Sequence, residues 1–270
     1  QEKAARSGSS FYYSFLFLPR DKREAITALY AFCREVDDCV DECREAEVAR
    51  AKLAWWRMEL DRLYRGVPQH PVTRALAPVV ARHDLPREQL EEIVDGMEMD
   101  LTFNRYPDFR SLELYCYRVA SVVGQLAATL FGHSDRRTLS YAHDLGLAFQ
   151  LTNIIRDVGE DARRNRIYLP LEDLHRFGVR EEDILAGRYT AAFQELMAFQ
   201  VERARATYAR ALAQLPAADR RNQRPGLVMA AIYQALLTEI ERDGFRVLDR
   251  RTALTPLRKF WIAWKAWVSP

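Results

Sequence analysis

Apolar residues recur with helical spacing along almost the whole chain, and no run of alternating polar and apolar residues indicates a strand. Proline, glycine and capping residues divide this pattern into separate helices. It predicts helices over residues 19–42, 45–64, 71–82, 86–104, 111–131, 135–157, 181–186, 190–215 and 226–250, with an irregular segment over residues 163–179. The sequence shows no linker and no short-period repeat, so we expect one all-α domain over residues 1–270.

Composition supports a soluble globular protein, because 49% of the residues are hydrophobic and 29% are charged. The formal net charge of +2 is too small to indicate nucleic-acid binding. Four cysteines in 270 residues do not make a disulfide framework, and we expect thiols in a reducing cytosol. The chain opens without a signal-peptide pattern, which also favours a cytoplasmic protein.

The longest stretch without a charged residue covers residues 119–134. It is only 16 residues long and contains Gly124, Gln125 and Gly132. A helix that spans a bilayer needs about 20 mostly apolar residues. We therefore expect a buried core helix here.

Two acidic clusters, about 120 residues apart in sequence, lie on predicted helices. Each cluster belongs to a set of four polar residues with helical spacing. The first set is Tyr30, Arg34, Asp37 and Asp41, and the second is Gln150, Asn153, Asp157 and Asp161. At 3.6 residues per turn each set lies along one helix face over roughly 16 Å. One such cluster alone is typical of a solvated helix end.

The repetition of the cluster changes that interpretation. Carboxylates four residues apart repel each other within a helix, so two such pairs indicate a compensating cation. Mg²⁺ prefers oxygen ligands and binds through a few carboxylates together with substrate phosphates. Arg34 and Arg156 lie next to the carboxylates, and we expect them to bind diphosphate oxygens rather than the neighbouring aspartates.

Other candidate groups are weaker. The five histidines show no metal-ligand spacing, and no glycine-rich nucleotide-binding loop is present. Tyr115 is interpreted from the residues alone as a core aromatic. The basic run at residues 163–166 is equally consistent with a loop that closes over phosphate and with a solvated turn.

Several longer motifs carry a resemblance to a known family. They are SGSSF at residues 7–11, YAFCREVDD at 30–38, GMEMDL at 96–101, YCYRVA at 115–120, and QLTNIIRDVGED at 150–161 with RIYLP at 166–170. The sequence resembles the squalene and phytoene synthases of the trans-isoprenyl diphosphate synthase fold over nearly its whole length.

This resemblance implies a helical bundle around a central apolar cavity, with three Mg²⁺ ions at its mouth holding the diphosphates of two prenyl substrates. It assigns Asp37, Asp41, Asn153, Asp157 and Asp161 to the metals. It places Tyr30, Arg34, Gln150, Arg156, Tyr233 and Arg250 at the diphosphates, and Tyr115 at the reacting carbons.

Within the family, the opening motif and the stretch at residues 119–124 are most similar to bacterial presqualene diphosphate synthases of hopanoid pathways. Phytoene synthases more often have glycine where Ser121 stands. The expected reaction is head-to-head condensation of two farnesyl diphosphates to presqualene diphosphate, without NADPH. The alternatives are a phytoene synthase that uses geranylgeranyl diphosphate, an NADPH-dependent squalene synthase, and a non-catalytic assembly factor that keeps the fold.

The C-terminal tail is rich in aromatic residues, with Phe260, Trp261, Trp264 and Trp267 next to Lys265. Tryptophan is enriched at membrane interfaces, so residues 260–267 are consistent with peripheral contact on the inner face of the cytoplasmic membrane. A terminal helix packed on the bundle is equally consistent with this pattern.

Overall fold

The computed structural model describes residues 14–15, 18–43 and 45–268. The motif at residues 7–11 that contributes to the resemblance lies outside the described residues. Within the described part the chain is helical, and its β-type pairing is one isolated parallel bridge between Arg105 and Ile167. The predicted all-α fold is confirmed.

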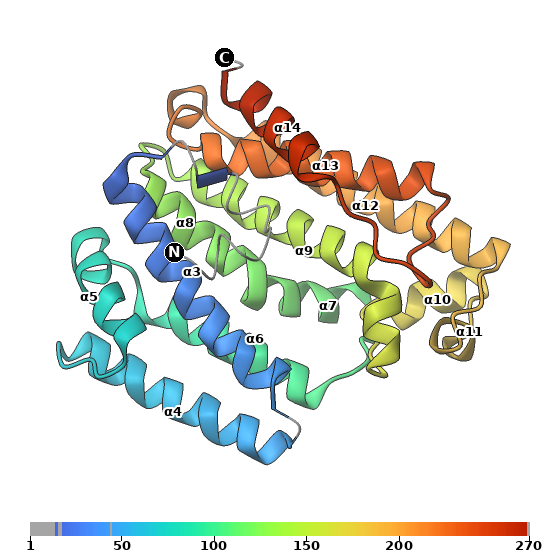
Figure 1. Cartoon of the computed structure of the whole chain (residues 1–270), viewed down its shortest axis with the longest axis horizontal. Helices are drawn as coiled ribbons and strands as arrows, with labels where there is room; N and C mark the ends of the chain where they lie inside the picture. Colours follow the sequence, from blue (N-terminus) through green and yellow to red (C-terminus); the bar gives the residue numbers. More distant parts are fainter. Residues whose placement is uncertain (1–13, 16–17, 44, 269–270) are drawn as a thin grey trace.

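Most helices follow one another with short connections, whereas residues 243–255 form a longer loop between the last two helices (Figure 1). In chain order they are α3 (Arg20–Asp41), α4 (Ala46–Tyr64), α5 (Pro71–His83), α6 (Arg87–Thr102), α7 (Phe109–Cys116), the π-helical turn η1 (Tyr117–Ser121), α8 (Val122–Phe131), α9 (Arg137–Arg163), α10 (Leu171–Phe177), α11 (Glu181–Leu185), α12 (Ala191–Gln214), the 3₁₀ turn η2 (Ala217–Asp219), α13 (Arg224–Arg242) and α14 (Pro256–Val268).

Local sequence signals explain where several of these helices begin. The Asp108 carboxylate accepts a hydrogen bond from the Ser111 amide at α7, and the Thr190 hydroxyl accepts one from the Phe193 amide at α12. Such caps satisfy amide groups that have no partner inside the helix. Pro71 occupies the first turn of α5, where its missing N–H costs nothing.

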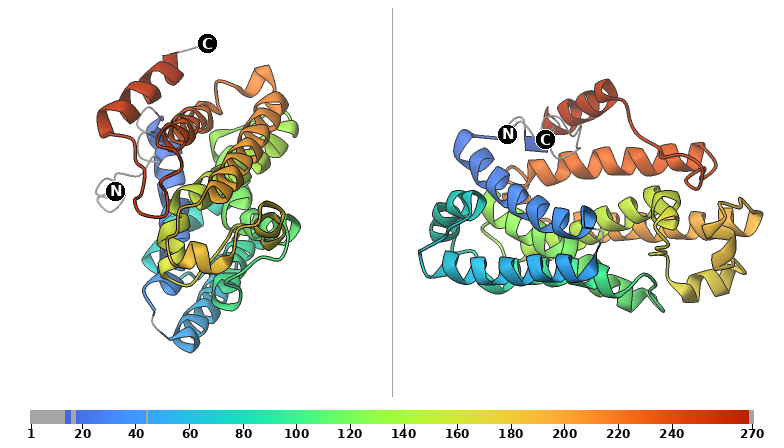
Figure 2. Two further views of the ribbon diagram at one scale, coloured as in Figure 1. Left: turned by 90° about the vertical axis from the view of Figure 1, so that its right-hand side faces the viewer. Right: turned by 60° about the horizontal axis from the view of Figure 1, so that its bottom comes forward.

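Two groups of helices meet along α8. Helices α4, α5 and α6 lie on one side of α3 and α8, whereas α9, α12 and α13 lie on the other, with α14 outermost on α13 (Figures 1 and 2). The buried hydrophobic residues likewise form two clusters, one in each group of helices. Leu126 and Leu130 of α8 belong to the core around α3, α4 and α6, and Ala128 belongs to the core around α9, α12 and α13.

The apolar helix predicted over residues 111–131 consists of α7, η1 and α8. Only this stretch of the described chain, Phe109–Phe131, is long and apolar enough to cross a membrane. It packs against α6 and α9, and its residue Ser121 is fully buried, donating a hydrogen bond to the His143 carbonyl at 2.8 Å. These contacts identify it as a core helix, as predicted.

Three predicted boundaries are wrong. Helix α9 continues to Arg163 instead of ending near Asp157, so both carboxylates of the second cluster lie on one continuous helix. The segment expected to be irregular contains α10, which begins after Pro170 and ends at Gly178. Helix α13 ends at Arg242 instead of Arg250, because Gly244 and Phe245 take positive φ angles of 67° and 61° that end the helix.

Candidate active site

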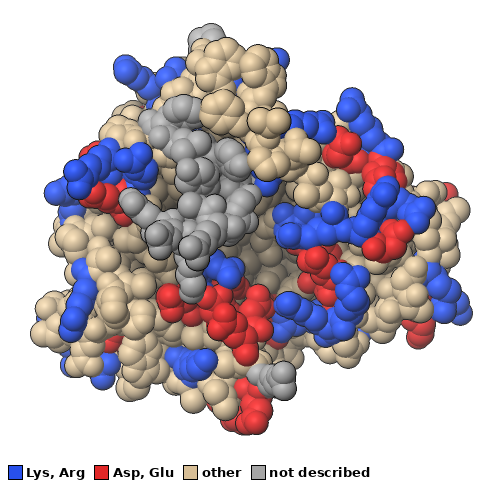
Figure 3. Space-filling model, in the orientation of Figure 1, with Lys and Arg blue, Asp and Glu red and all other residues tan. Residues whose placement is uncertain are grey.

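A cavity of about 550 Å³ opens between α3, α6, α8, α9 and α13. Its lining divides by chemistry along these helices. Charged and polar side chains come from the C-terminal halves of α3 and α9, and apolar side chains come from the N-terminal halves of the same helices and from α8. In the space-filling view, acidic side chains gather over the C-terminal half of α3 and basic side chains lie beside them (Figure 3).

The two acidic clusters line this one cavity. Helix α3 contributes Tyr30, Arg34, Asp37 and Asp41, and helix α9 contributes Gln150, Asn153, Arg156, Asp157, Glu160 and Asp161. Each set comes from one face of its helix, as its spacing predicts. Residues 120 positions apart in sequence are therefore brought to one site by the packing of α3 and α9 around the same space.

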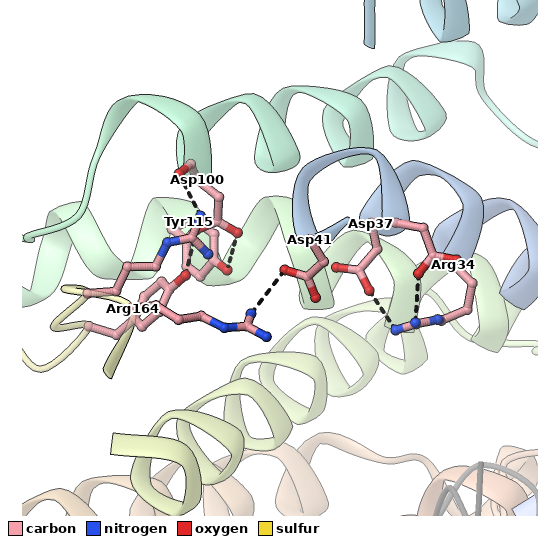
Figure 4. Close-up of polar contacts among 9 residues, drawn as sticks. Arg34, Asp37, Asp41, Asp100, Tyr115 and Arg164 are labelled. Atoms are coloured by element: carbon pink, nitrogen blue, oxygen red, sulfur yellow. Dashed lines mark hydrogen bonds and ion pairs between the residues drawn. The ribbon is translucent and has the colours of Figure 1, made fainter. Parts of the chain in front are cut away.

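The arginines beside the clusters pair with carboxylates of their own helices, contrary to expectation. Arg34 donates to Asp37 at 2.6 Å and to Asp38 at 2.8 Å (Figure 4). Arg156 donates through Nε to Asp157 at 2.7 Å. The sequence argument reserved these guanidinium groups for diphosphate, but without a diphosphate the adjacent carboxylate is the nearest acceptor. A bound phosphate would compete for the same donors.

The carboxylates of the site titrate differently because their surroundings differ. Burial and the neighbouring Asp41 raise the pKa of Asp37 to about 6, and burial and Asp157 raise the pKa of Asp161 to about 7. Burial alone would raise the pKa of Asp157 as well, but hydrogen bonds from Arg156 and Arg251 lower it. Burial and mutual repulsion thus disfavour the charged forms of Asp37 and Asp161, whereas two guanidinium groups favour the charged form of Asp157.

Asn153 gives the most specific sign that the residues of this site fit a cation. Its side-chain oxygen Oδ1 is buried without a hydrogen-bond partner, and its Nδ2 donates to Gln150 at 3.3 Å. A buried oxygen without a partner is costly, and it is a ligand that hard cations accept. No three His, Cys, Asp or Glu side chains of the described residues converge closely enough to hold a metal ion alone. The oxygen donors fit a divalent cation that also needs ligands from a substrate.

A half-buried carboxylate joins two tyrosines on the wall of the cavity. Asp100 of α6 accepts hydrogen bonds from the Tyr115 hydroxyl at 2.9 Å and from the Tyr168 hydroxyl at 2.7 Å. The two rings stack with centroids 5.3 Å apart. Burial raises the pKa of Asp100, and burial also keeps Tyr115 a neutral phenol by raising its pKa. Tyr115 is buried, as expected for a core aromatic, but its side chain also lines the cavity.

The segment after α9 completes this wall. Its backbone pairs with the segment after α6, through the Ile167 amide and the Asn104 carbonyl at 3.0 Å and the Leu171 amide and the Tyr106 carbonyl at 2.9 Å. This pairing carries Arg164 and Arg166 to the cavity. Arg164 lies 3.4 Å from Asp41 across the mouth (Figure 4). Of the two interpretations of this basic run, the geometry favours the one that involves phosphate.

The structure places Arg250 away from the cavity and its neighbour Arg251 in it. Arg250 pairs with Asp243 on the surface, whereas Arg251 donates to Asp157 at 2.8 Å and lies 3.4 Å from Glu160. Gly159 of α9 fixes this register, since a Cβ there would lie 2.5 Å from the carbonyl oxygens of Val247 and Leu248. The prediction of Arg250 as a site residue is therefore wrong, and we assign Arg251 to the candidate site instead.

Tyr233 of α13, which the resemblance places at the diphosphates, lines the cavity. It is buried, and its ring packs on Phe149 with centroids 4.9 Å apart. Sequence reasoning did not select Asp100, Glu160, Tyr168 or Arg251 as site residues. Asp100 and Tyr168 lie within motifs that carried the resemblance, so that signal was present. Arg251 follows a loop whose path no periodicity predicts.

The fold and site place the chain in the class of all-helical isoprenoid synthases. Two solved structures show the same architecture. A dehydrosqualene synthase in complex with a ligand has a TM-score of 0.87 and 28% identity, covering 98% of this chain and 93% of that one. Squalene synthase HpnC from Alicyclobacillus acidocaldarius has a TM-score of 0.81 and 31% identity, covering 90% and 92%.

The chain belongs to the squalene/phytoene synthase family, whose family model matches residues 4–258. Presqualene diphosphate synthase of Rhodopseudomonas palustris is 41% identical over 239 residues, 88% of this chain and 85% of the relative. Phytoene synthase of Arthrospira platensis is 36% identical over 268 residues, 94% of this chain and 87% of the relative. The family resemblance is confirmed, and its members condense prenyl diphosphates head to head. The identities lie too close together to choose between the two activities.

Proposed function

We propose that this protein condenses two farnesyl diphosphates head to head to presqualene diphosphate, releasing diphosphate. The observation that carries the proposal is a single cavity with oxygen donors and arginines at one end and an apolar lining at the other. Such a cavity matches a ligand with a diphosphate head and a hydrocarbon tail. The choice of farnesyl diphosphate is supported by the stretch at residues 119–124, which has Ser121 where phytoene synthases more often have glycine.

Departure of diphosphate is the first chemical requirement. Breaking the C1–O bond leaves an allylic cation and a diphosphate anion, whose charge Arg34, Arg156 and Arg251 are placed to neutralise. Asp37, Asp41, Asn153, Asp157 and Asp161 would hold Mg²⁺, for which we propose three ions as in the family. Bound Mg²⁺ supplies further positive charge to the leaving diphosphate.

The apolar part of the cavity protects the cation from water. Attack of the C2=C3 double bond of the second substrate on C1 forms the new carbon–carbon bond, and loss of a proton closes the cyclopropane. The Tyr115 hydroxyl donates a hydrogen bond to Asp100, so the lone pairs of its oxygen are available toward positive charge in the cavity. A proton taken by this oxygen can pass on to Asp100, because burial raises the pKa of that carboxyl.

A second candidate is phytoene synthesis from two geranylgeranyl diphosphates, favoured by the longer alignment with a phytoene synthase. The two activities use the same head chemistry and differ in tail length. Purified protein with Mg²⁺ and each substrate supplied separately distinguishes them by the carbon number of the product. No product from either substrate would overturn the proposal.

We also propose that α14 docks on the inner face of the cytoplasmic membrane. The helix packs on α13 through Ala263, which is fully buried, and leaves the bulky side chains of Leu257, Trp261 and Val268 84%, 60% and 56% exposed. Helix α14 contains Arg258, Lys259 and Lys265 and no carboxylate, and Arg258 pairs with Glu239 of α13. Exposed tryptophan with clustered cations suits an anionic bilayer.

Co-sedimentation with vesicles tests the docking. The wild-type protein is expected to bind vesicles that contain phosphatidylglycerol more strongly than neutral phosphatidylcholine vesicles. A variant with Trp261→Ser and Trp264→Ser is expected to lose this binding without losing condensation of a soluble substrate. Equal binding of wild type and variant would exclude α14 as the docking surface.

A further inference from the structure

The cavity extends away from the acidic clusters, and helix directions define its far end. Tyr141 and Asp157 both line the cavity from α9 and are 16 residues apart, which corresponds to about 24 Å along a helix. Helices α3, α8 and α13, together with Gln223 just before α13, also contribute lining residues at the Tyr141 end. They are Ile26, Ala128, Phe131, Gln223 and Gly226.

Direct contacts hold these elements together. Gln223 donates through Nε2 to the carbonyl oxygens of Ala128 at 3.1 Å and Gly132 at 3.0 Å, which ties the start of α13 to the end of α8. Phe131 packs against Phe15 with ring centroids 6.1 Å apart. These contacts hold α8 and α13 together at the far end of the cavity, and we call the packed residues there the floor.

Tyr141 and Gly226 form the tightest contact of that floor. Tyr141 is only 1% exposed, and its hydroxyl is buried without a hydrogen-bond partner among the described residues. A Cβ at position 226 would lie 2.6 Å from this hydroxyl. The tyrosine therefore requires glycine at its neighbour, and any larger residue would push the phenol ring out of its place.

We propose that Tyr141, seated on Gly226, sets the longest prenyl chain that the cavity accepts. The inference rests on the proposed function and names the residue pair that selects between substrates of different tail length. Hydrogen bonding does not explain the tyrosine, because a buried hydroxyl without a partner destabilises the fold and phenylalanine would avoid that cost. What the hydroxyl adds at this place is length, since it extends the ring to contact α13 and closes the floor.

Four variants of the full-length protein test the pair. Tyr141→Ala and the milder Tyr141→Leu shorten the floor residue, and Gly226→Ala pushes the phenol. The double variant Gly226→Ala with Tyr141→Phe removes the atom with which the new methyl group collides. Tyr208→Ala is the matched control, because Tyr208 is equally buried but does not line the cavity. Each protein is assayed with farnesyl and with geranylgeranyl diphosphate, and its thermal unfolding is recorded.

Shortening Tyr141 is expected to raise the ratio of kcat/KM for geranylgeranyl over farnesyl diphosphate by at least about tenfold. Gly226→Ala is expected to lower kcat/KM for both substrates, and the double variant to restore it. Tyr208→Ala is expected to lose thermal stability with an unchanged ratio.

If folded Tyr141→Leu keeps the wild-type ratio of kcat/KM for the two substrates, the proposed role of Tyr141 in chain-length selection is wrong. The same holds if the double variant does not restore kcat/KM. Neither result contradicts the proposed condensation activity. A wild-type protein inactive on both substrates would instead overturn the proposed function.

Discussion

Replacing Arg251 and Arg250 separately by alanine gives the most discriminating test of the candidate site. The two arginines are adjacent in sequence and both are about half exposed, with side-chain exposures of 48% and 60%. Only Arg251 reaches the cavity, where its Nε lies 2.8 Å from Asp157. If Arg251 binds the departing diphosphate, its loss removes a hydrogen bond between charged groups from the transition state.

The magnitude follows from that single interaction. Hydrogen bonds to charged groups contribute about 1.5–3 kcal/mol, and about 1.4 kcal/mol corresponds to a factor of ten in rate. Arg251→Ala is therefore expected to lower kcat/KM by roughly ten- to hundredfold. Arg251→Lys is expected to recover part of the loss, because it keeps the charge but not the planar pair of donors.

Arg250→Ala is the control for this comparison. Its surface pair with Asp243 is screened by water and contributes about 0–1 kcal/mol to stability, so kcat/KM is expected to stay within about twofold. The assay is steady-state condensation of farnesyl diphosphate at saturating Mg²⁺. A loss in Arg250→Ala that equals the loss in Arg251→Ala would refute the assignment of Arg251 to the site.

Further variants test the metal, the tyrosine and the fold. Asp157→Asn is expected to reduce the rate of condensation at least about hundredfold. Removal of divalent cations with EDTA is expected to abolish condensation until Mg²⁺ is restored. Activity that survives EDTA would exclude the metal assignment. Tyr115→Phe is expected to lower kcat by about 10²–10⁴-fold with little change in KM, and a change in KM alone would indicate a binding role. Glu59→Gln is expected to destabilise the protein by about 1–3 kcal/mol in urea unfolding at pH 7, because the fully buried Glu59 carboxylate accepts hydrogen bonds from Gln69, His70 and Thr73. Burial opposes ionisation of Glu59, but these bonds outweigh it and lower its pKa from 4.5 to about 2. The stabilisation by Glu59 is thus complete above pH 4.5 and is lost as the pH falls toward 2. The free energy of unfolding of Glu59→Gln is therefore expected to depend less on pH over this range than that of the wild type. Parallel pH dependences of the two proteins would contradict the role of the Glu59 hydrogen bonds.

The sequence predicts the helices of this fold and the residues that repeat along them. Asp37 and Asp41, like Asp157 and Asp161, share a helix face by spacing alone, and the cavity contains all four. Periodicity works here because the side-chain direction in a helix depends on local geometry. It does not give the partner that a side chain chooses, which is why the pairing of Arg34 with Asp37 was not foreseen.

Residues supplied by loops escaped sequence reasoning for a different reason. Tyr168 reaches Asp100 because the segment after α9 pairs with the segment after α6, and Arg251 reaches Asp157 because Gly159 lets the backbone of residues 247–248 approach. Both contacts join residues more than 60 positions apart through irregular backbone. No repeating pattern of polar and apolar residues encodes such paths, so periodicity selects neither residue, although Tyr168 lies within a motif that carried the family resemblance.

The most direct test of the central claim is the identity of the product formed by the purified protein with Mg²⁺, without NADPH, from farnesyl diphosphate. Organic extraction followed by mass spectrometry distinguishes a condensed thirty-carbon diphosphate from unreacted substrate. We predict a thirty-carbon cyclopropyl diphosphate that is absent with Asp37→Ala and Asp157→Ala. A protein that condenses neither farnesyl nor geranylgeranyl diphosphate would contradict the proposal that this cavity joins two prenyl chains head to head.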